Sequence, residues 1–194
     1  MLEVLRQPLE DREVHISRVN AAFTYPADFI LIAAMNPCPC GYLGDPQREC
    51  TCTDGEIRRY GQKISGPLLD RIDLHVSVMR PKYSELTATI QGEPSCDIAK
   101  RVAEARAVQA ERLSRWHMQS NAQMGHRQLK ETCQLDAEGT EMLRVVFEKL
   151  HLSARSYDRI IKVARTIADL AGSDQIRPEH VAEAISFRNM INGK

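Results

Sequence analysis

The stretch Phe29-Ile-Leu-Ile-Ala-Ala-Met-Asn-Pro37 decides how this chain of 194 residues is organised. A continuous apolar run of this kind is typical of a parallel strand that is buried on both faces. Asn36 follows at the end of the run, and the carboxyl ends of such strands are where α/β sheets handle nucleotides. The sequence therefore predicts a central strand that presents a candidate phosphate reporter. A simple cap at the strand end is the alternative for Asn36.

The segments on either side of this run predict further elements of an α/β core. Residues 13–18 alternate in polarity and residues 21–25 can return beside them, which predicts a β-hairpin inserted before the central strand. A helix over residues 56–69 and a second strand over residues 74–78 follow. Strand, helix and strand in this order predict a parallel unit with a right-handed crossover.

Composition and the amino terminus limit the class of protein. The hydrophobic content is 43%, and 26 basic residues balance 26 acidic ones, which is typical of a soluble globular chain and argues against a strongly basic DNA-binding surface. No run is long enough to span a membrane and no signal-peptide layout is present, so we expect a cytoplasmic protein with no membrane partner. Leu2, Leu5 and Leu9 predict a helix with no cap before it, which favours a fragment of a longer protein.

The carboxyl half of the chain predicts a bundle of helices. Its first helix carries an apolar face and a charged face that we expect to be solvated; the apolar residues are Ile98, Val102, Ala105, Leu113 and Trp116, and the charged ones are Arg101, Glu104, Arg112 and Arg115. Residues 117–134 are predicted as a loop with one short helix. A second long helix contains Leu143, Val146, Phe147 and Leu150. Ser153 is predicted to cap the next helix and Pro178 to open the last one.

A polar, glycine-containing segment, residues 87–94, is predicted as the hinge between the two halves. The resulting division is an α/β core portion over residues 1–90 and an α-helical lid over residues 91–194.

The cysteines are the second strong signal. Cys38, Cys40, Cys50 and Cys52 form two Cys-X-Cys pairs in one glycine-rich loop. Four thiols this close, in a chain without an export signal, predict a tetrahedral zinc site in preference to disulfides, with free thiols as the alternative. Each Cys-X-Cys pair can reach one metal only through a tight turn. Cys96 and Cys133 stand apart, and both are predicted to be small buried hydrophobic residues.

Three separated motifs remain to be explained: Leu31-Ile-Ala-Ala-Met-Asn-Pro-Cys-Pro-Cys-Gly41, Gly66-Pro-Leu-Leu-Asp-Arg-Ile-Asp-Leu-His-Val76 and Ser153-Ala-Arg-Ser-Tyr-Asp-Arg159. In this order they resemble the magnesium-chelatase-like AAA+ proteins and, more narrowly, their ComM (YifB) competence branch. The resemblance covers nearly the whole chain. It implies an α/β fold, in which the C-terminal part of an AAA+ core, with parallel strands and an inserted β-hairpin, precedes an α-helical lid bundle. It also implies that residues 2–10 follow directly after a Walker B strand.

The resemblance implies roles for three residues. Asn36 matches sensor 1, which orients the attacking water near the γ-phosphate. Arg71 matches the arginine finger that reaches the nucleotide of a neighbouring subunit, where a permanently charged, planar guanidinium suits phosphoryl oxygens. Arg155 matches sensor 2 at the start of a lid helix, where the helix dipole also favours anions, and Arg159 lies one turn further on as its substitute.

Read without the resemblance, the same arginines have ordinary explanations. Arg71 would form a surface salt bridge with Asp70 or Asp73, and Arg155 would be an exposed helical arginine.

The chain also departs from this family. It contains no G-x-x-x-x-G-K-[ST] loop and no apolar strand that ends in paired acids, so we do not expect it to bind and hydrolyse ATP alone. For a longer parent, the resemblance implies ATP and Mg²⁺ as cofactors, a ring of like subunits, and a hexamer that drives DNA branch migration in natural transformation. The hairpin with His15, Arg18 and Asn20 is the candidate pore element, and subunit packing is its alternative.

Two other functions stay open at this point. One is a chelatase-type motor subunit that remodels a protein partner and never touches DNA, which the neutral net charge favours. The other is a zinc-stabilised adaptor without catalysis, in which the ATPase motifs are relics.

Overall fold

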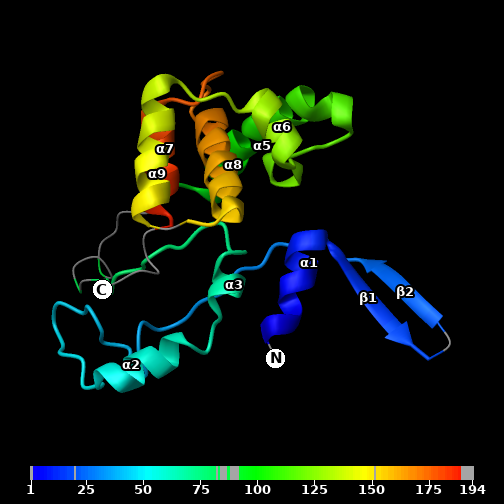
Figure 1. The fold of residues 1–194 in the computed structure, drawn as a ribbon. Helices are drawn as coiled ribbons and strands as arrows, with labels where there is room; N and C mark the ends of the chain where they lie inside the picture. Colours follow the sequence, from blue (N-terminus) through cyan, green and yellow to red (C-terminus); the bar gives the residue numbers. More distant parts are fainter. Residues whose placement is uncertain are drawn as a thin grey trace. The chain divides into compact units, whose positions relative to one another are not determined.

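The computed structural model describes residues 2–19, 21–81, 83, 87, 92–150 and 152–188 (Figure 1). Asn20 of the predicted hairpin and residues 88–91 of the predicted hinge lie outside these residues. The chain divides into two compact units, one running up to Ile72 with Val78–Arg80, the other comprising Asp73–Ser77 and the residues from Pro81 onward. In the described part of the chain, no helix is both long enough and apolar enough to cross a membrane.

The first unit begins with helical turns and a hairpin. A 3-10 turn, Leu2–Leu5, leads into α1 (Arg6–Asp11), so the predicted amino-terminal helix is confirmed. Strands β1 (Glu13–Arg18) and β2 (Ala21–Pro26) then pair antiparallel, which confirms the predicted hairpin.

The predicted buried strand at residues 29–37 is wrong for this chain as it stands. Residues 27–36 have no regular secondary structure and join no sheet, and Ile30 and Ile32 are 88% and 90% exposed. Residues 74–78 are likewise not a strand; the backbone N–H of His75 donates to the carbonyl of Phe187. The physical reason is that a strand needs a neighbour for its backbone groups, and the only sheet among the described residues is the two-stranded hairpin.

The predicted helix over residues 56–69 is two helices. The first, α2 (Asp54–Gly61), begins at a capping box in which Thr53 and Glu56 satisfy each other's backbone N–H groups. The second, α3 (Gly66–Leu69), begins anew because Ser65 caps it and Pro67, which lacks an N–H, fits only its first turn. The break places Arg71 just beyond the end of α3.

The second unit is helical, as the sequence predicts. Its elements are α5 (Ser95–Leu113), a 3-10 turn (Ser114–Trp116), a second 3-10 turn (Asn121–Gln123), α6 (His126–Thr132), α7 (Ala137–Lys149), α8 (Ala154–Leu170) and α9 (Pro178–Ser186). Ser153 caps α8 through its side chain, and Pro178 opens α9. In Figure 1, α8 lies beside α9 and α5, with α7 against α9.

The core of the second unit forms around the apolar face of α8. Its buried members are Leu113, Met124, Leu129, Cys133, Leu143, Ile160, Ile161, Ala164, Ala168, Ile176, Val181, Ala184 and Ile185. Each fully buried large aliphatic side chain in such a core contributes about 1.5–3 kcal/mol to the free energy of folding. The small residues Ala164 and Ala168, both 0% exposed, let the neighbouring helices approach α8 closely.

Two predictions for the helical half need correction. The apolar face predicted for α5 is buried only toward its carboxyl end, at Ala105 and Leu113, whereas Ile98 and Val102 are 41% and 42% exposed. Cys133 is buried as predicted, but Cys96 is exposed because it lies in the first turn of α5, away from the core.

Candidate nucleotide-sensing residues and metal centre

Asn36 lies at the end of the apolar run, just before a tight turn of the chain. The backbone N–H of Gly41 donates to the carbonyl of Cys38 at 3.1 Å. Gly41 has φ +82°, a left-handed conformation that favours glycine. A methyl group added at Gly41 would lie 3.7 Å from Nδ2 of Asn36, so this amide side chain rests beside the turn. The amide is otherwise exposed to solvent.

Arg71 is held close to the protein surface by an acidic partner. Its Nη2 forms an ion pair with Glu10 of α1, and its Nη1 donates to the carbonyl of Pro67 at 2.7 Å. The side chain is only 10% exposed. A salt bridge of Arg71 is therefore present, and Glu10, a residue that the sequence did not single out, supplies a carboxylate for it.

Arg155 and Arg159 lie one turn apart at the start of α8, as predicted. Arg155 is exposed in the first turn, directly after the cap at Ser153. Arg159 forms an ion pair with Asp73, and its side chain is 14% exposed. Arg155 is therefore the more exposed of the two, while Arg159 faces a carboxylate.

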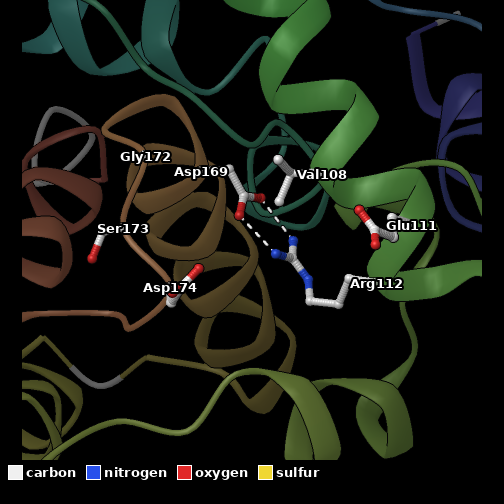
Figure 2. A pocket seen from close by; sticks show the side chains of 7 residues that line it. All are labelled: Val108, Glu111, Arg112, Asp169, Gly172, Ser173 and Asp174. Carbon is white, nitrogen blue, oxygen red and sulfur yellow. Dashed lines mark hydrogen bonds and ion pairs between the residues drawn. The ribbon is translucent and has the colours of Figure 1, made fainter.

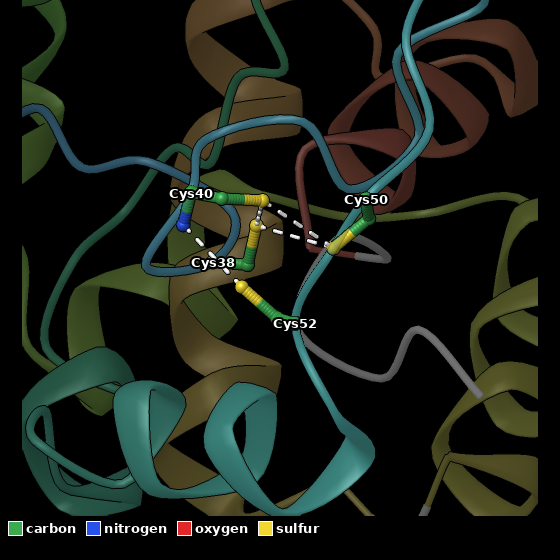
Figure 3. Close-up of side chains that lie close together, drawn as sticks. All are labelled: Cys38, Cys40, Cys50 and Cys52. Atoms are coloured by element: carbon green, nitrogen blue, oxygen red, sulfur yellow. Dashed lines mark hydrogen bonds between the residues drawn. The ribbon is translucent and has the colours of Figure 1, made fainter.

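The four cysteines of the loop come together, as the sequence predicts (Figure 3). Their sulfur atoms all lie within 4.8 Å of one another. The sulfur of Cys38 is 3.3 Å from that of Cys40 and 3.6 Å from that of Cys50, and the backbone N–H of Cys40 donates to the sulfur of Cys52 at 3.4 Å. The turn closed by Gly41 supplies the tight geometry that a Cys-X-Cys pair needs.

These thiols perturb one another's ionisation strongly. A backbone N–H from Tyr42 donates to the sulfur of Cys40 and lowers the pKa of that thiol to about 5. The hydrogen bond from the backbone N–H of Cys40 lowers the pKa of the Cys52 thiol. Burial and the neighbouring thiols outweigh it and raise this pKa to about 12. Negative charges this close cannot all form unless a cation neutralises them.

A buried ionic cluster in the second unit was missed from the sequence (Figure 2). The carboxylate of Asp169, which is 0% exposed, accepts two hydrogen bonds from Arg112, at 2.8 Å each, one from Arg165 at 3.1 Å and one from Asn121 at 2.8 Å. Arg112 was predicted to lie on a solvated face. This prediction is wrong, because the Arg112 side chain turns toward Asp169 of α8. Asp169 and Arg112 line a cavity of about 350 Å³. Both arginines are paired with the carboxylate, so the cluster stabilises the packing of α5 against α8.

Both portions of the chain match known family models. Residues 1–86 match the model described as magnesium chelatase, subunit ChlI, and residues 92–188 match the model described as magnesium chelatase, subunit ChlI C-terminal. The chain therefore belongs to the magnesium chelatase subunit ChlI family.

Particular relatives narrow the resemblance. The chain is 41% identical over 193 residues to competence protein ComM of Haemophilus influenzae. The aligned residues make up 98% of this chain and 36% of that protein. It is 40% identical over 189 residues to the uncharacterized protein YifB of Escherichia coli. This alignment covers 96% of this chain and 36% of that protein. The resemblance to the ComM (YifB) branch is confirmed. The chain spans 36% of the length of these curated relatives.

Proposed function

We propose that this chain supplies the sensor, finger and lid parts of an ATP-hydrolysing AAA+ ring motor. The main support is membership of the magnesium chelatase family in both portions of the chain, together with a polar or cationic residue at each of the three motif positions, Asn36, Arg71 and Arg155. The whole protein would use ATP and Mg²⁺. The chain alone is expected to be inactive, because its sequence lacks the phosphate-cradling loop and the acids that hold magnesium.

The geometry suggests how these residues would act on a nucleotide. Arg155 projects from the first turn of α8, where the helix dipole adds to its own attraction for phosphate oxygens. Glu10 holds the guanidinium of Arg71 in place until the phosphates of a neighbouring subunit compete for it. Asn36 would orient the attacking water beside the γ-phosphate. ATP binding and release would then bias the lid between two positions.

Mixing two inactive variants of the whole protein tests whether Arg71 acts in trans. In a ring, each site would combine Arg155 of one subunit with Arg71 of the next. Arg71→Ala and Arg155→Ala proteins are each expected to lose most ATP turnover, by about 10³-fold or more for the finger. In a random equal mixture, about one interface in four regains both arginines, so turnover should recover to about a quarter of the wild-type rate.

The result of mixing shows whether Arg71 and Arg155 of one site come from different subunits or from the same subunit. Recovery on mixing supports a finger in trans, whereas no recovery in mixtures shown to co-assemble would mean that one and the same subunit supplies both arginines to a site. Arg127→Ala is a matched control, because Arg127 is an exposed arginine that pairs with Glu131 one turn further along α6. This variant should retain full turnover.

We also propose that the motor acts on DNA through the hairpin. In the register of β1 and β2, Ile16 pairs with Phe23, Val14 with Tyr25 and Arg18 with Ala21, so two aromatic side chains and Arg18 share one face. Phe23 and Tyr25 are about half exposed. Exposed aromatic rings beside a cation are typical of surfaces that bind single-stranded nucleic acid by stacking and phosphate contact.

Titration of the whole protein with single-stranded and forked DNA at several salt concentrations tests this role. Arg18→Ala should weaken binding and reduce the salt slope by about one phosphate contact, while Phe23→Ala should weaken binding with the slope unchanged. Arg127→Ala again serves as the control. An unchanged slope in Arg18→Ala would refute the phosphate contact and would favour a hairpin that packs subunits together.

A motor that remodels a protein partner is the second candidate function. The equal number of acidic and basic residues favours it, since a protein substrate needs no basic surface. ATP turnover that is insensitive to any DNA would support this candidate. A whole protein that neither turns over ATP nor binds DNA would leave only the zinc-stabilised adaptor.

A further inference from the structure

The loop between Asn36 and α2 has an interior made of sulfur. Among residues 37–53, Cys38 is the only fully buried side chain, and the two Cys-X-Cys pairs lie at the two ends of the loop. A segment this short cannot bury enough apolar surface to hold one conformation, and segments of this kind usually depend on a metal or a disulfide. The four thiols therefore form the interior of the loop, where a larger domain would have apolar side chains.

The loop nonetheless adopts a defined course. The carboxylate of Asp45 accepts the backbone N–H groups of Gln47 and Arg48, at 2.8 and 3.2 Å. The guanidinium of Arg48 lies 4.0 Å from the ring centre of Tyr42 and donates to its hydroxyl at 2.8 Å. These contacts order the middle of the loop, so both cysteine pairs can face each other without further rearrangement.

The sulfur positions fit a single tetrahedral ion. Zinc binds thiolate sulfur at about 2.3 Å, which places the sulfurs of a tetrahedron about 3.8 Å apart. The shortest distances here are 3.3 and 3.6 Å, and none exceeds 4.8 Å. This spacing has room for one ion and not for an iron–sulfur cluster, whose own sulfides separate the cysteines further. It is also too long for disulfides, which join sulfurs at about 2.05 Å.

We infer that Cys38, Cys40, Cys50 and Cys52 bind one zinc ion, and that this ion holds the Cys38–Gly41 turn against Asn36. Binding releases the remaining thiol protons to solvent and transfers no electrons. All four positions around the ion are filled by protein ligands, so the site is structural. The importance of holding Asn36 rests on its proposed role as a nucleotide sensor, whereas the zinc site itself does not depend on that role.

Elemental analysis of the chain, purified without added metal, tests the zinc site. We expect about one zinc per chain in the wild type and in Cys96→Ser, whose exposed thiol lies outside the cluster. The double variant Cys50→Ser/Cys52→Ser should lose the metal. Cys50→His keeps four ligands and should retain the metal. This variant shows whether metal is lost with the ligands or through failure to fold.

Cobalt substitution identifies the ligands directly. A cobalt-loaded wild type should show the intense absorption of a tetrahedral thiolate site, and Cys50→His should shift these bands as one sulfur becomes nitrogen. A folded wild type that is free of metal, that contains iron, or whose mass shows disulfides would overturn the zinc site. Retention of zinc by the double serine variant would overturn the ligand set.

A second measurement tests the contact with Asn36. In NMR spectra, the side-chain amide signals of Asn36, assigned by their loss in Asn36→Ala, should shift between the zinc-loaded and chelated chain. The amide of Asn121, buried in the second unit, is the control and should not shift. If zinc binds and the side-chain amide signals of Asn36 do not shift, the proposal that the ion holds the turn against Asn36 is refuted. Because neither measurement involves ATP, their failure is distinct from failure of the proposed function.

Discussion

Replacing Asp169 by alanine should destabilise the helical unit more than any single surface change. The carboxylate is 0% exposed and accepts hydrogen bonds from two arginines and Asn121. Its removal leaves the guanidinium of Arg165, whose side chain is 2% exposed, without its charge partner. Removing one member of a buried ion pair typically costs about 3–5 kcal/mol, because the remaining charge stays buried.

The structure places the expected cost at the lower end of this range. Arg165 keeps the backbone carbonyls of Ser173 and Asp174 as acceptors. Arg112 is 21% exposed and can recruit water when the carboxylate is lost. We therefore expect a loss of about 3 kcal/mol, which lowers the melting temperature of a unit of this size by about 12–24 °C.

Thermal and urea unfolding of wild type and Asp169→Ala, followed by far-UV circular dichroism, measure this loss. Glu141→Ala is the matched control, since it also breaks a two-point arginine–carboxylate pair, with Arg144, but on the exposed face of α7. Its melting temperature should stay close to that of the wild type. A loss below about 1 kcal/mol in Asp169→Ala would refute the reasoning, because the cluster would then contribute no more than a surface pair.

Other predictions can be checked in the same way. Ser153→Ala removes the side-chain cap of α8 and should cost about 1 kcal/mol in urea unfolding, whereas a change at the exposed Ser114 hydroxyl should cost less. Gly41→Ala forces a methyl group into φ +82° and should weaken zinc retention against a chelator, with helical content unchanged. Adding a strong chelator to the wild type should speed proteolysis within residues 37–53 and leave α8 intact.

Patterns that act over short distances in the sequence predicted the helical unit well. The apolar spacing of α7, the cap at Ser153 and the proline at the start of α9 each involve residues within a few positions, and each predicted element is present. The cysteine cluster was predictable for the same reason, since Cys38 and Cys52 belong to one short loop.

Interactions between distant parts of the sequence were not predictable. Arg112 reaches Asp169 across 57 positions, and Arg71 reaches Glu10 across 61. Nothing in the helical spacing of α5 distinguishes Arg112 from the neighbouring charged residues. The sole local signal of the cluster was the i,i+4 spacing of Arg165 and Asp169 along α8, which by itself is also typical of a solvated pair.

The wrong prediction at residues 29–37 is informative about the whole protein. The apolar run has the composition of a strand buried on both faces, yet Ile30 and Ile32 are almost fully exposed among the described residues. An exposed apolar segment that lies outside any sheet is a site for pairing with another strand. The matched relatives extend well beyond the region that this chain covers. We therefore expect strands of the whole protein to cover the run, and the same sheet would then fix the position of Asn36 at its end.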